Sequence, residues 1–327
     1  MSRHFPANAA KWFLPPSPPL ADAPLESSYH RPVLAEAVTG LVVTNPDGIY
    51  IDATVGGGGH SRLILGGLSE RGLLIATDRD DDAISHARSV LPPAVILVRS
   101  RFSELAATTA ASRKAGVDGI LMDLGVSSHQ IDEAERGFSH RFEGPLDLRM
   151  DRTTGESAAG LVNRLSEADL ARIIFAYGED PQAKRIARAI IRERGNVPIE
   201  TTADLARVID RSVPATRVKS LARVFQALRI AVNDELAELE AGLAQSWEML
   251  RTGGRLVVIS YHSLEDRIVK GFMKSKSTAP PGEWPFPSDA KPEGTLLLKK
   301  PLTPDESEVT VNPRSRSAKL RAIEKTV

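Results

Sequence analysis

The sequence predicts an α/β protein with a doubly wound, mostly parallel sheet and an inserted all-helical domain. Short apolar strands alternate with helical patterns from residue 49 to about residue 123, which is typical of a parallel sheet. From residue 156 to about residue 230 only helical patterns occur, and the alternation then resumes. A chain of 327 residues with 42% hydrophobic content can form one large domain or two.

The composition excludes several kinds of chemistry and location. The chain has 42 basic and 42 acidic residues, so a nucleic-acid partner must be argued from local patches. It has no cysteine, which excludes disulfides, thiolate metal sites and a cysteine nucleophile. No run of about 20 apolar residues and no signal-peptide pattern occur. We therefore expect a cytoplasmic protein that does not span a membrane.

The first strand leads into a glycine-rich loop and a helix. Ile49 to Ile51 predict a buried strand that ends at Asp52, four glycines occupy positions 56–59, and a helical pattern begins at Ser61. Glycines let the backbone approach a ligand closely, and the following helix presents free N–H groups. The strict G-x-G-x-x-G pattern fails because Ser61 or Arg62 stands at its last position. An ordinary strand-to-helix turn therefore remains the alternative.

The second strand is predicted over Gly72 to Thr77 and is followed by an acid. This residue, Asp78, lies 19 residues after Gly59. An acid at this place can accept hydrogen bonds from both ribose hydroxyls of a nucleoside cofactor. The alternative is a helix N-cap, a role that the acids at positions 80–82 can also fill.

The third and fourth strands are predicted over Ala94 to Val98 and Gly119 to Met122. Phe102 follows the third strand, where it can lie against an adenine ring or simply fill the core. Asp123 follows the fourth strand, but the run after it lacks the Asp-Pro-Pro-Tyr pattern of many amino-methylating enzymes. Both residues are thus expected at the ligand-binding edge of the sheet.

The helical insertion is more basic than the rest of the chain. Between residues 181 and 229 there are eleven Lys or Arg and four Asp or Glu, a balance of +7 in a neutral chain. The C-terminal tail adds five more cations, namely Arg314, Arg316, Lys319, Arg321 and Lys325. Clustered cations favour contacts with nucleic-acid phosphates, although a solvated helix face is the alternative.

Sequence patterns divide the chain into four segments. Residues 1–28 are rich in proline and are expected to form a disordered extension. The catalytic domain is expected in two parts, residues 29–127 and 225–327, on either side of a helical insertion at 128–224. Within the second part we expect a strand over Arg255 to Ser260 and a closing antiparallel pair near residues 295–298 and 315–322.

Two histidines and a tyrosine complete the candidate site. Tyr261 and His262 follow the strand that ends at Ser260, and His60 follows the glycine loop. Either histidine taken alone can be an ordinary loop residue. No His/Asp/Glu cluster has the spacing of metal ligands, so we expect no metal.

Several long motifs together resemble a known family, the bacterial ribosomal RNA small-subunit methyltransferases H, or MraW family. The resemblance extends from about Tyr29 to the C-terminus and leaves residues 1–28 outside. It rests on these segments, in this order: 52–61 (DATVGGGGHS), 78–80 (DRD), 101–103 (RFS), 121–128 (LMDLGVSS), 144–150 (GPLDLRM), 225–230 (FQALRI), 232–235 (VNDE), 260–267 (SYHSLEDR) and 312–321 (NPRSRSAKLR).

The resemblance implies a Rossmann-like class I S-adenosylmethionine-dependent methyltransferase that acts on the small ribosomal subunit. Its product would be N4-methylcytidine in the decoding region of 16S rRNA. By position, the cofactor contacts carry over to a set of seven residues, and the helical insertion matches the substrate domain of the family. The seven are Gly58, Gly59, His60, Asp78, Phe102, Asp123 and Gln130.

The residues themselves agree with amine methylation. Methylation of a pyrimidine at C5 normally needs a cysteine adduct, which this chain cannot form. An exocyclic amine or a ribose hydroxyl is then the more suitable acceptor, and alignment of the reacting atoms should contribute most to the rate. We expect Asp123 or a neighbouring carbonyl to accept a hydrogen bond from the amine, and Tyr261 or His262 to stack on a flipped-out base.

Other functions remain open at this point. A ribose 2′-O-methyltransferase would use the same fold and cofactor on another acceptor atom. A non-catalytic ribosome assembly factor would bind rRNA without the cofactor. A nicotinamide oxidoreductase should have a cleaner glycine pattern and no basic insertion. The sequence also leaves open whether the protein forms a homodimer.

Overall fold

The computed structural model describes residues 32–108, 116–279 and 291–327. The predicted extension at residues 1–28 lies outside the described residues. The chain divides into two compact units, one formed by Met1–Gly125 with Glu240–Val327 and one by Val126–Leu239. We call them the sheet unit and the helical unit.

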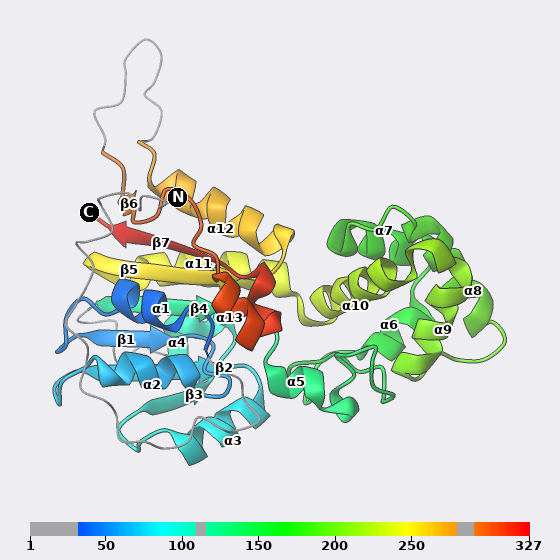
Figure 1. Cartoon of the computed structure of the whole chain (residues 1–327), viewed down its shortest axis with the longest axis horizontal. Helices are drawn as coiled ribbons and strands as arrows, with labels where there is room; N and C mark the ends of the chain where they lie inside the picture. The colour runs from blue at the N-terminus through cyan, green and yellow to red at the C-terminus, as the bar shows by residue number, and fades with distance from the viewer. Residues whose placement is uncertain (1–31, 109–115, 280–290) are drawn as a thin grey trace, which may run out of the picture. The chain divides into compact units, whose positions relative to one another are not determined.

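The sheet unit is built on a mostly parallel sheet. Within the described residues its seven strands lie in the order β3-β2-β1-β4-β5-β7-β6, and β7 alone runs in the opposite direction to the others (Figure 1). The order reverses between β1 and β4, and ligands of doubly wound sheets bind at such a reversal. The strands are β1 Ile49–Asp52, β2 Leu73–Asp78, β3 Ile96–Arg99, β4 Val117–Asp123, β5 Leu250–Ser260, β6 Gly294–Leu296 and β7 Lys319–Lys325.

Helices cover both faces of this sheet because its strands are apolar on both sides. Leu121 of β4 points to the face that packs against α1 and α2, whereas the next residue, Met122, approaches Gly242 of α11. The helical segments are α1 Ala35–Val42, α2 Gly59–Gly66, α3 Asp81–Val90, η2 Phe102–Glu104, α4 Leu105–Thr108, α11 Glu235–Met249, α12 Ser263–Lys276, α13 Glu306–Val311 and η6 Pro313–Ser317. Of these, α11 begins in the helical unit and continues into the sheet unit.

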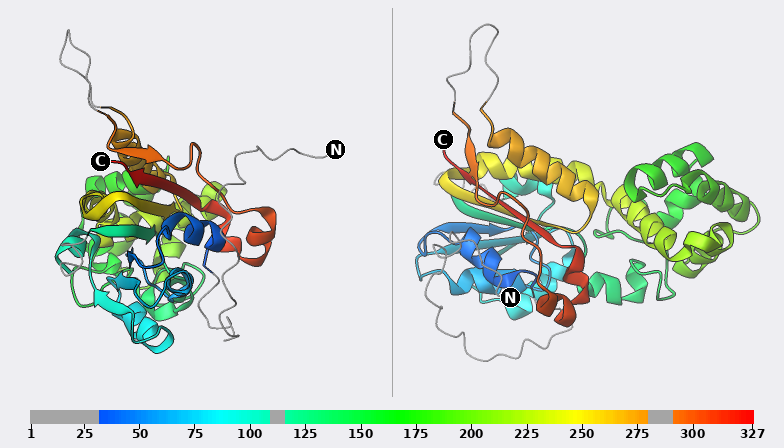
Figure 2. Two further views of the ribbon diagram at one scale, coloured as in Figure 1. Left: turned by 90° about the vertical axis from the view of Figure 1, so that its left-hand side faces the viewer. Right: turned by 45° about the horizontal axis from the view of Figure 1, so that its top comes forward.

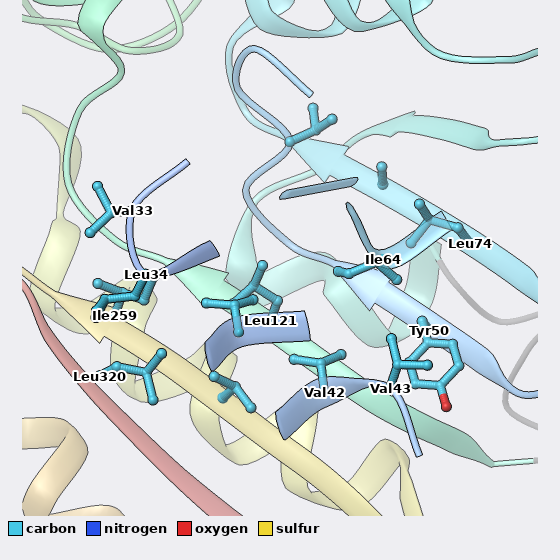
Figure 3. Packing of buried hydrophobic residues seen from close by; sticks show 14 of the residues in the cluster. Val33, Leu34, Val42, Val43, Tyr50, Ile64, Leu74, Leu121, Ile259 and Leu320 are labelled. Carbon is cyan, nitrogen blue, oxygen red and sulfur yellow. The ribbon is translucent and has the colours of Figure 1, made fainter. Parts of the chain in front are cut away.

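One core cluster holds the first of these faces together. This cluster joins helices and strands that are distant in the sequence, and Figure 3 shows Val42 of α1, Tyr50 of β1, Ile64 of α2 and Leu320 of β7 among its members. Tyr50 is fully buried, and its hydroxyl donates to the carbonyl of Asn45 at 2.9 Å. The core therefore fixes the strand ends from which the candidate site is built.

The last strands form the far edge of the sheet. β6 pairs with β7 and β7 pairs with β5, both antiparallel, as predicted for a closing pair (Figure 2). The expected bounds differ, because residues 315–317 form part of η6 and β7 begins at Lys319. β5 also begins at Leu250, five residues before the predicted start at 255, because Leu250 pairs with Val117 before a register shift.

The helical unit has its own hydrophobic core. Ser166 and Thr201 cap α7 and α9, since each side chain accepts the N–H of the third following residue. In Figure 1 α7 lies along α10, and α8 lies beside α9. The segments are α5 Ser128–Asp132, η4 Ala134–Arg136, α6 Ala158–Arg164, α7 Glu167–Gly178, α8 Ala183–Arg194, α9 Thr202–Ser212, η5 Pro214–Thr216 and α10 Arg217–Asn233.

The helical unit is larger than the predicted insertion. It begins at Val126 instead of residue 128 and continues to Leu239, whereas the sequence placed the end at residue 224. The reason is that α10 runs without a break to Asn233, and its residues Phe225 and Leu228 belong to the core of the helical unit. The motif at 225–230 is therefore part of the helical unit.

Within the described ranges, none of the helices has the length and apolar character needed to cross a bilayer.

Candidate active site

The candidate site lies at the carboxyl ends of the parallel strands of the sheet unit. β1 ends at Asp52, β2 at Asp78, β4 at Asp123 and β5 at Ser260, just before Tyr261. β1 and β4 are neighbours in the sheet, so Asp52 and Asp123 close adjacent strands at the point where the strand order reverses. Acidic groups thus gather where a doubly wound sheet binds its ligand.

The glycine loop adopts a backbone that other residues would strain. Gly56 and Gly58 have φ angles of 46° and 78°, and Gly58 is the N-cap of α2. A Cβ on Gly58 would lie 3.3 Å from Cδ2 of Leu91, and one on Gly59 would lie 3.2 Å from Cδ of Pro32. These positions need glycine for conformation and for space.

Asp78 fastens this loop to the end of β2. Its Oδ2 accepts the N–H of Gly56 at 3.0 Å, and its Oδ1 accepts the N–H of Asp80 at 3.0 Å. Burial raises the pKa of Asp78 to about 6, although both backbone hydrogen bonds oppose the shift. Each carboxylate oxygen has a second lone pair for a further donor, so the group can still accept two hydroxyls. The N-cap of α3 is Asp80, which separates that role from Asp78.

A second carboxylate, that of Asp52, holds both ends of the glycine loop by hydrogen bonds. Asp52 is fully buried; its Oδ2 accepts the Ser61 hydroxyl at 2.6 Å and its Oδ1 accepts the Thr54 N–H at 3.1 Å. Burial raises the pKa of Asp52, an effect that the Ser61 hydrogen bond opposes. The Thr54 hydroxyl in turn accepts the backbone N–H of Asp123 at 2.8 Å. The ends of β1 and β4 are therefore joined by side-chain hydrogen bonds.

Asp123 is held between two side chains from different elements. Its Oδ1 accepts the Tyr261 hydroxyl at 2.8 Å, and its Oδ2 lies 3.4 Å from Nδ1 of His60. Burial, together with the charge of Asp123, raises the pKa of Tyr261 far above its ordinary value, so the phenol stays protonated and donates. The carboxylate of Asp123 thus has a fixed orientation.

His262 and Tyr261 are fixed by the start of α12. Glu265 is buried, and its Oε2 accepts the backbone N–H of Tyr261 at 2.8 Å and that of His262 at 3.2 Å. His262 is the N-cap, and its Nδ1 accepts the N–H of Glu265 at 3.4 Å. This reciprocal capping box sets the tautomer of His262, with the proton on Nε2.

The two remaining predicted residues, Phe102 and Gln130, make structural contacts. Phe102 begins η2 after β3, and its side chain approaches Gly242 so closely that a Cβ on Gly242 would lie 2.7 Å from Cβ and 3.1 Å from Cγ of Phe102. Gln130 belongs to the helical unit, where its side chain closes a capping box with Ser127 at the start of α5.

The structure thus brings His60, Asp123 and Tyr261 into one hydrogen-bonded group and places Asp78 on the glycine loop. Sequence reasoning missed Thr54 and Ser61, which tie the strand ends together, and Glu265, which fixes the turn after β5. The spacing of His262 and Glu265, an N-cap followed three residues later by an acid, was the available signal for the last of these.

The loop and Asp78 together fit a nucleoside cofactor. Gly58 leaves the start of α2 without a side chain, and the first N–H groups of that helix offer partial positive charge to electron-rich atoms. Asp78 places carboxylate acceptors beside this loop at the carboxyl end of the adjacent strand. Fold and site therefore define a Rossmann-like enzyme that uses a nucleoside cofactor.

Comparisons with known proteins show the family to which the chain belongs. The chain matches the MraW methylase family over residues 27–326 and belongs to that family. It is 47% identical to "Ribosomal RNA small subunit methyltransferase H" of Geobacter sp. (strain M21), over 92% of this chain and 100% of that protein. It is 49% identical to the protein of the same name from Geotalea uraniireducens (strain Rf4), over 91% of this chain and 98% of that protein.

Family membership settles the class of enzyme. The chain is a Rossmann-like methyltransferase that depends on S-adenosylmethionine, which confirms the predicted family, fold class and cofactor. The nicotinamide oxidoreductase is thereby excluded.

Proposed function

We propose that this protein transfers a methyl group from S-adenosylmethionine to the N4 amine of one cytidine in the decoding region of 16S rRNA. The observation that carries the proposal is the fixed Asp123 carboxylate at the ligand-binding edge, in a chain that has no cysteine for C5 chemistry. The names of the relatives support rRNA of the small subunit as substrate. We place the reaction in the cytoplasm, where that RNA is found.

The glycine loop and its neighbours are the proposed cofactor site. Gly58, Gly59 and the backbone of His60 would face the donor at the start of α2, and Asp78 would accept its ribose hydroxyls. When bound, the donor supplies an electrophilic methyl group. Phe102, Asp123 and Gln130 complete the proposed cofactor set.

Asp123 is the proposed catalytic residue. A cytosine amine has its lone pair drawn into the ring, so a hydrogen bond from one amine N–H to a carboxylate helps the nitrogen to pyramidalise. Oδ1 of Asp123 accepts the Tyr261 hydroxyl and Oδ2 faces the His60 ring, and each oxygen has a further lone pair that can accept another hydrogen bond. Asp123 therefore acts as a hydrogen-bond acceptor that aligns the amine with the methyl group. This alignment contributes most to the rate of the reaction.

Tyr261 and His262 have supporting roles in this proposal. The Tyr261 hydroxyl orients Asp123, and its ring lies against Gly125, where a Cβ would be 3.4 Å from Cδ2 of the ring. The backbone N–H of Glu265 fixes the tautomer of His262. Of the two residues, His262 is the better candidate for stacking on an extruded base, because the Tyr261 ring lies against Gly125.

The helical unit is the proposed RNA-binding domain. In the described part of the chain, Lys184 and Arg192 of α8 are exposed and have no carboxylate partner, and they lie eight residues apart on one helix face. Several other cations of this unit are already paired, such as Arg188 with Glu167 at 3.4 Å. The unpaired cations are therefore the ones available for phosphates.

Single-turnover methylation of small ribosomal subunits with tritiated donor tests the catalytic assignment. Asp123→Asn should lower the transfer rate by about 100-fold, comparable with the loss of one hydrogen bond to a charged group, about 1.5–3 kcal/mol. Asp118→Asn changes a carboxylate at the opposite end of β4 and serves as a check on folding of that strand. Unchanged transfer and unchanged donor affinity in Asp123→Asn would remove Asp123 from the site.

Salt dependence of RNA binding tests the role of the helical unit. Replacing Lys184 and Arg192 by Gln should reduce the magnitude of the slope of log K against log salt by about 1.4–1.8, because each phosphate contact contributes about 0.7–0.9. The matched control replaces Lys270 and Lys274, two exposed lysines of α12 in the sheet unit, and should leave the slope nearly unchanged. Equal slopes in both variants would remove α8 from the RNA interface.

The same assays separate the two alternatives. Nuclease digestion and mass spectrometry of the product would place the methyl group on a ribose if the enzyme were a 2′-O-methyltransferase. A non-catalytic assembly factor would bind the particles and transfer no label.

A further inference from the structure

The imidazole of His60 lies between two hydrogen-bond acceptors. Its Nε2 is 2.9 Å from the carbonyl oxygen of Val33, and its Nδ1 is 3.4 Å from Oδ2 of Asp123. The ring is 6% exposed, so water cannot replace either partner easily. Resemblance places His60 among the cofactor contacts, but its side chain is engaged with these two protein groups.

Two acceptors require two N–H donors. A neutral imidazole carries one N–H, so it would leave a nitrogen lone pair against either the carbonyl or the carboxylate. An imidazolium satisfies both partners at once. The remaining arrangement, a neutral ring that accepts a proton held by Asp123, is disfavoured because carboxylic acids ordinarily lose their proton near pH 3.9 and imidazolium near pH 6.5.

The carbonyl partner of His60 is held in place by a short strap. This strap, residues 32–34, crosses the glycine loop: the Pro32 ring lies against Gly59, and the Leu34 N–H donates to Oε1 of Glu308 at 2.8 Å. Leu34 has a φ of 53°, a left-handed conformation that is uncommon for a residue other than glycine. Glu308 in α13 thus fixes the direction in which the Val33 carbonyl points.

We propose that His60 is a cationic positioning residue for Asp123, held in its doubly protonated form by the strap carbonyl on one side and the carboxylate on the other. The role of Asp123 itself rests on the proposed function. The charge of His60 fixes the carboxylate oxygen that Tyr261 does not hold, so that Asp123 presents its acceptor atoms in one orientation. Glu308 acts one step further out, through the strap.

The charges that face His60 support this assignment. They are Asp123 from the end of β4 and Asp52 from the end of β1. Burial by itself lowers the pKa of His60, but the hydrogen bond and charge of Asp123 and the charge of Asp52 outweigh it, so the pKa of His60 is raised above its ordinary value.

Nitrogen NMR of histidine-labelled protein tests the protonation state without any methylation assay, so its outcome is independent of the proposed function. The His60 signals are assigned from the spectrum of His60→Gln. We expect both ring nitrogens of His60 to carry protons at pH 7.5, and Asp123→Asn to remove one of them. A wild-type ring with a single protonated nitrogen at pH 7.5 would overturn the proposal.

The positioning role predicts a change in the pH profile. In Glu308→Ala the Leu34 N–H loses its acceptor and the strap loosens, so methyl transfer should fall with rising pH earlier than in the wild type, by about tenfold relative to the wild type between pH 6.5 and pH 8.5. The control is Glu306→Ala, an exposed acid of the same helix α13 that does not hold the strap. If Glu308→Ala and Glu306→Ala have the same pH profile, with His60 doubly protonated in both, Glu308 has no such role.

Discussion

Replacing Asp78 by asparagine should weaken donor binding more than any other single conservative change in the sheet unit. Asp78 accepts the N–H groups of Gly56 and Asp80 with separate oxygens, and the proposed ribose hydroxyls use the remaining lone pairs. Asparagine keeps the shape but turns one of the two oxygens into a donor. That donor then faces either a backbone N–H or a ribose hydroxyl that needs an acceptor.

The magnitude follows from the contacts that are lost. One hydrogen bond to a charged group contributes about 1.5–3 kcal/mol, which corresponds to about a 10- to 150-fold increase in Kd. Because the Gly56 N–H also loses its partner in one orientation of the amide, we expect a value in the upper half of this range. The transfer rate at saturating donor should change much less, since Asp78 does not contact Asp123 in the described structure.

Isothermal titration calorimetry with S-adenosylmethionine at pH 7.5 measures this change. The matched control is Asp81→Asn, which removes a carboxylate from the first turn of α3, where it pairs with Arg99 at 2.9 Å and does not hold the glycine loop. The control should change Kd by less than about threefold, in line with the small contribution of exposed ion pairs. An Asp78→Asn protein with the Kd of the wild type would refute the assignment of Asp78 to the ribose.

Three further predictions concern pH, backbone and stability. Because burial raises the pKa of Asp78 to about 6, donor affinity should rise as the pH increases through 6 and stay constant above it; an affinity that falls over that interval contradicts the ionised acceptor. Gly58→Ala, at a φ of 78°, should lower the unfolding free energy measured in urea by about 1–2 kcal/mol and should also weaken donor binding measured by calorimetry. Gly155→Ala, at a φ of 77° with open space around it, should lower only the unfolding free energy. Equal donor affinities in the two variants would show that the loop is not a ligand site. Asn233→Ala should lower the unfolding free energy of the helical unit by about 3 kcal/mol, because the Met150 N–H and the Leu148 carbonyl lose their hydrogen-bond partner. The control Asn196→Ala, at an exposed position, should change the unfolding free energy by less than about 0.5 kcal/mol. Similar urea midpoints for both variants would contradict a stabilising role of Asn233.

The sheet could be predicted from sequence because its signals are local. The parallel strands β1, β2 and β4 are short apolar runs that each end at an acid, and Asp52, Asp78 and Asp123 are the last residues of these strands in the structure. The caps at Ser166 and Thr201 were equally readable, since capping depends on residues three positions apart. These features need no knowledge of tertiary contacts.

What the sequence did not predict depends on pairing over long distances. The early start of β5 requires Leu250 to pair with Val117, a residue that is distant in the sequence. The end of the helical unit differs from the expected bound because no local pattern says which core Phe225 and Leu228 join. Such choices are made by packing and not by periodicity.

The site shows the same division. Asp78, Asp123 and Tyr261 could be placed at one edge because strand ends converge there. The contact between His60 and Val33 joins residues 27 positions apart through a strap with a left-handed leucine, and no sequence pattern announces it. The hydrogen bond from the Leu34 N–H to Glu308 joins residues 274 positions apart, and no sequence pattern indicates it either.

Nucleoside mass spectrometry of 16S rRNA, from cells with and without the gene for this protein, tests the central claim most directly. The account predicts that N4-methylcytidine at one decoding-region position is lost with the gene and is restored by the wild-type protein but not by Asp123→Asn. Retention of that nucleoside in cells without the gene, or loss of a ribose methyl group instead, would contradict it.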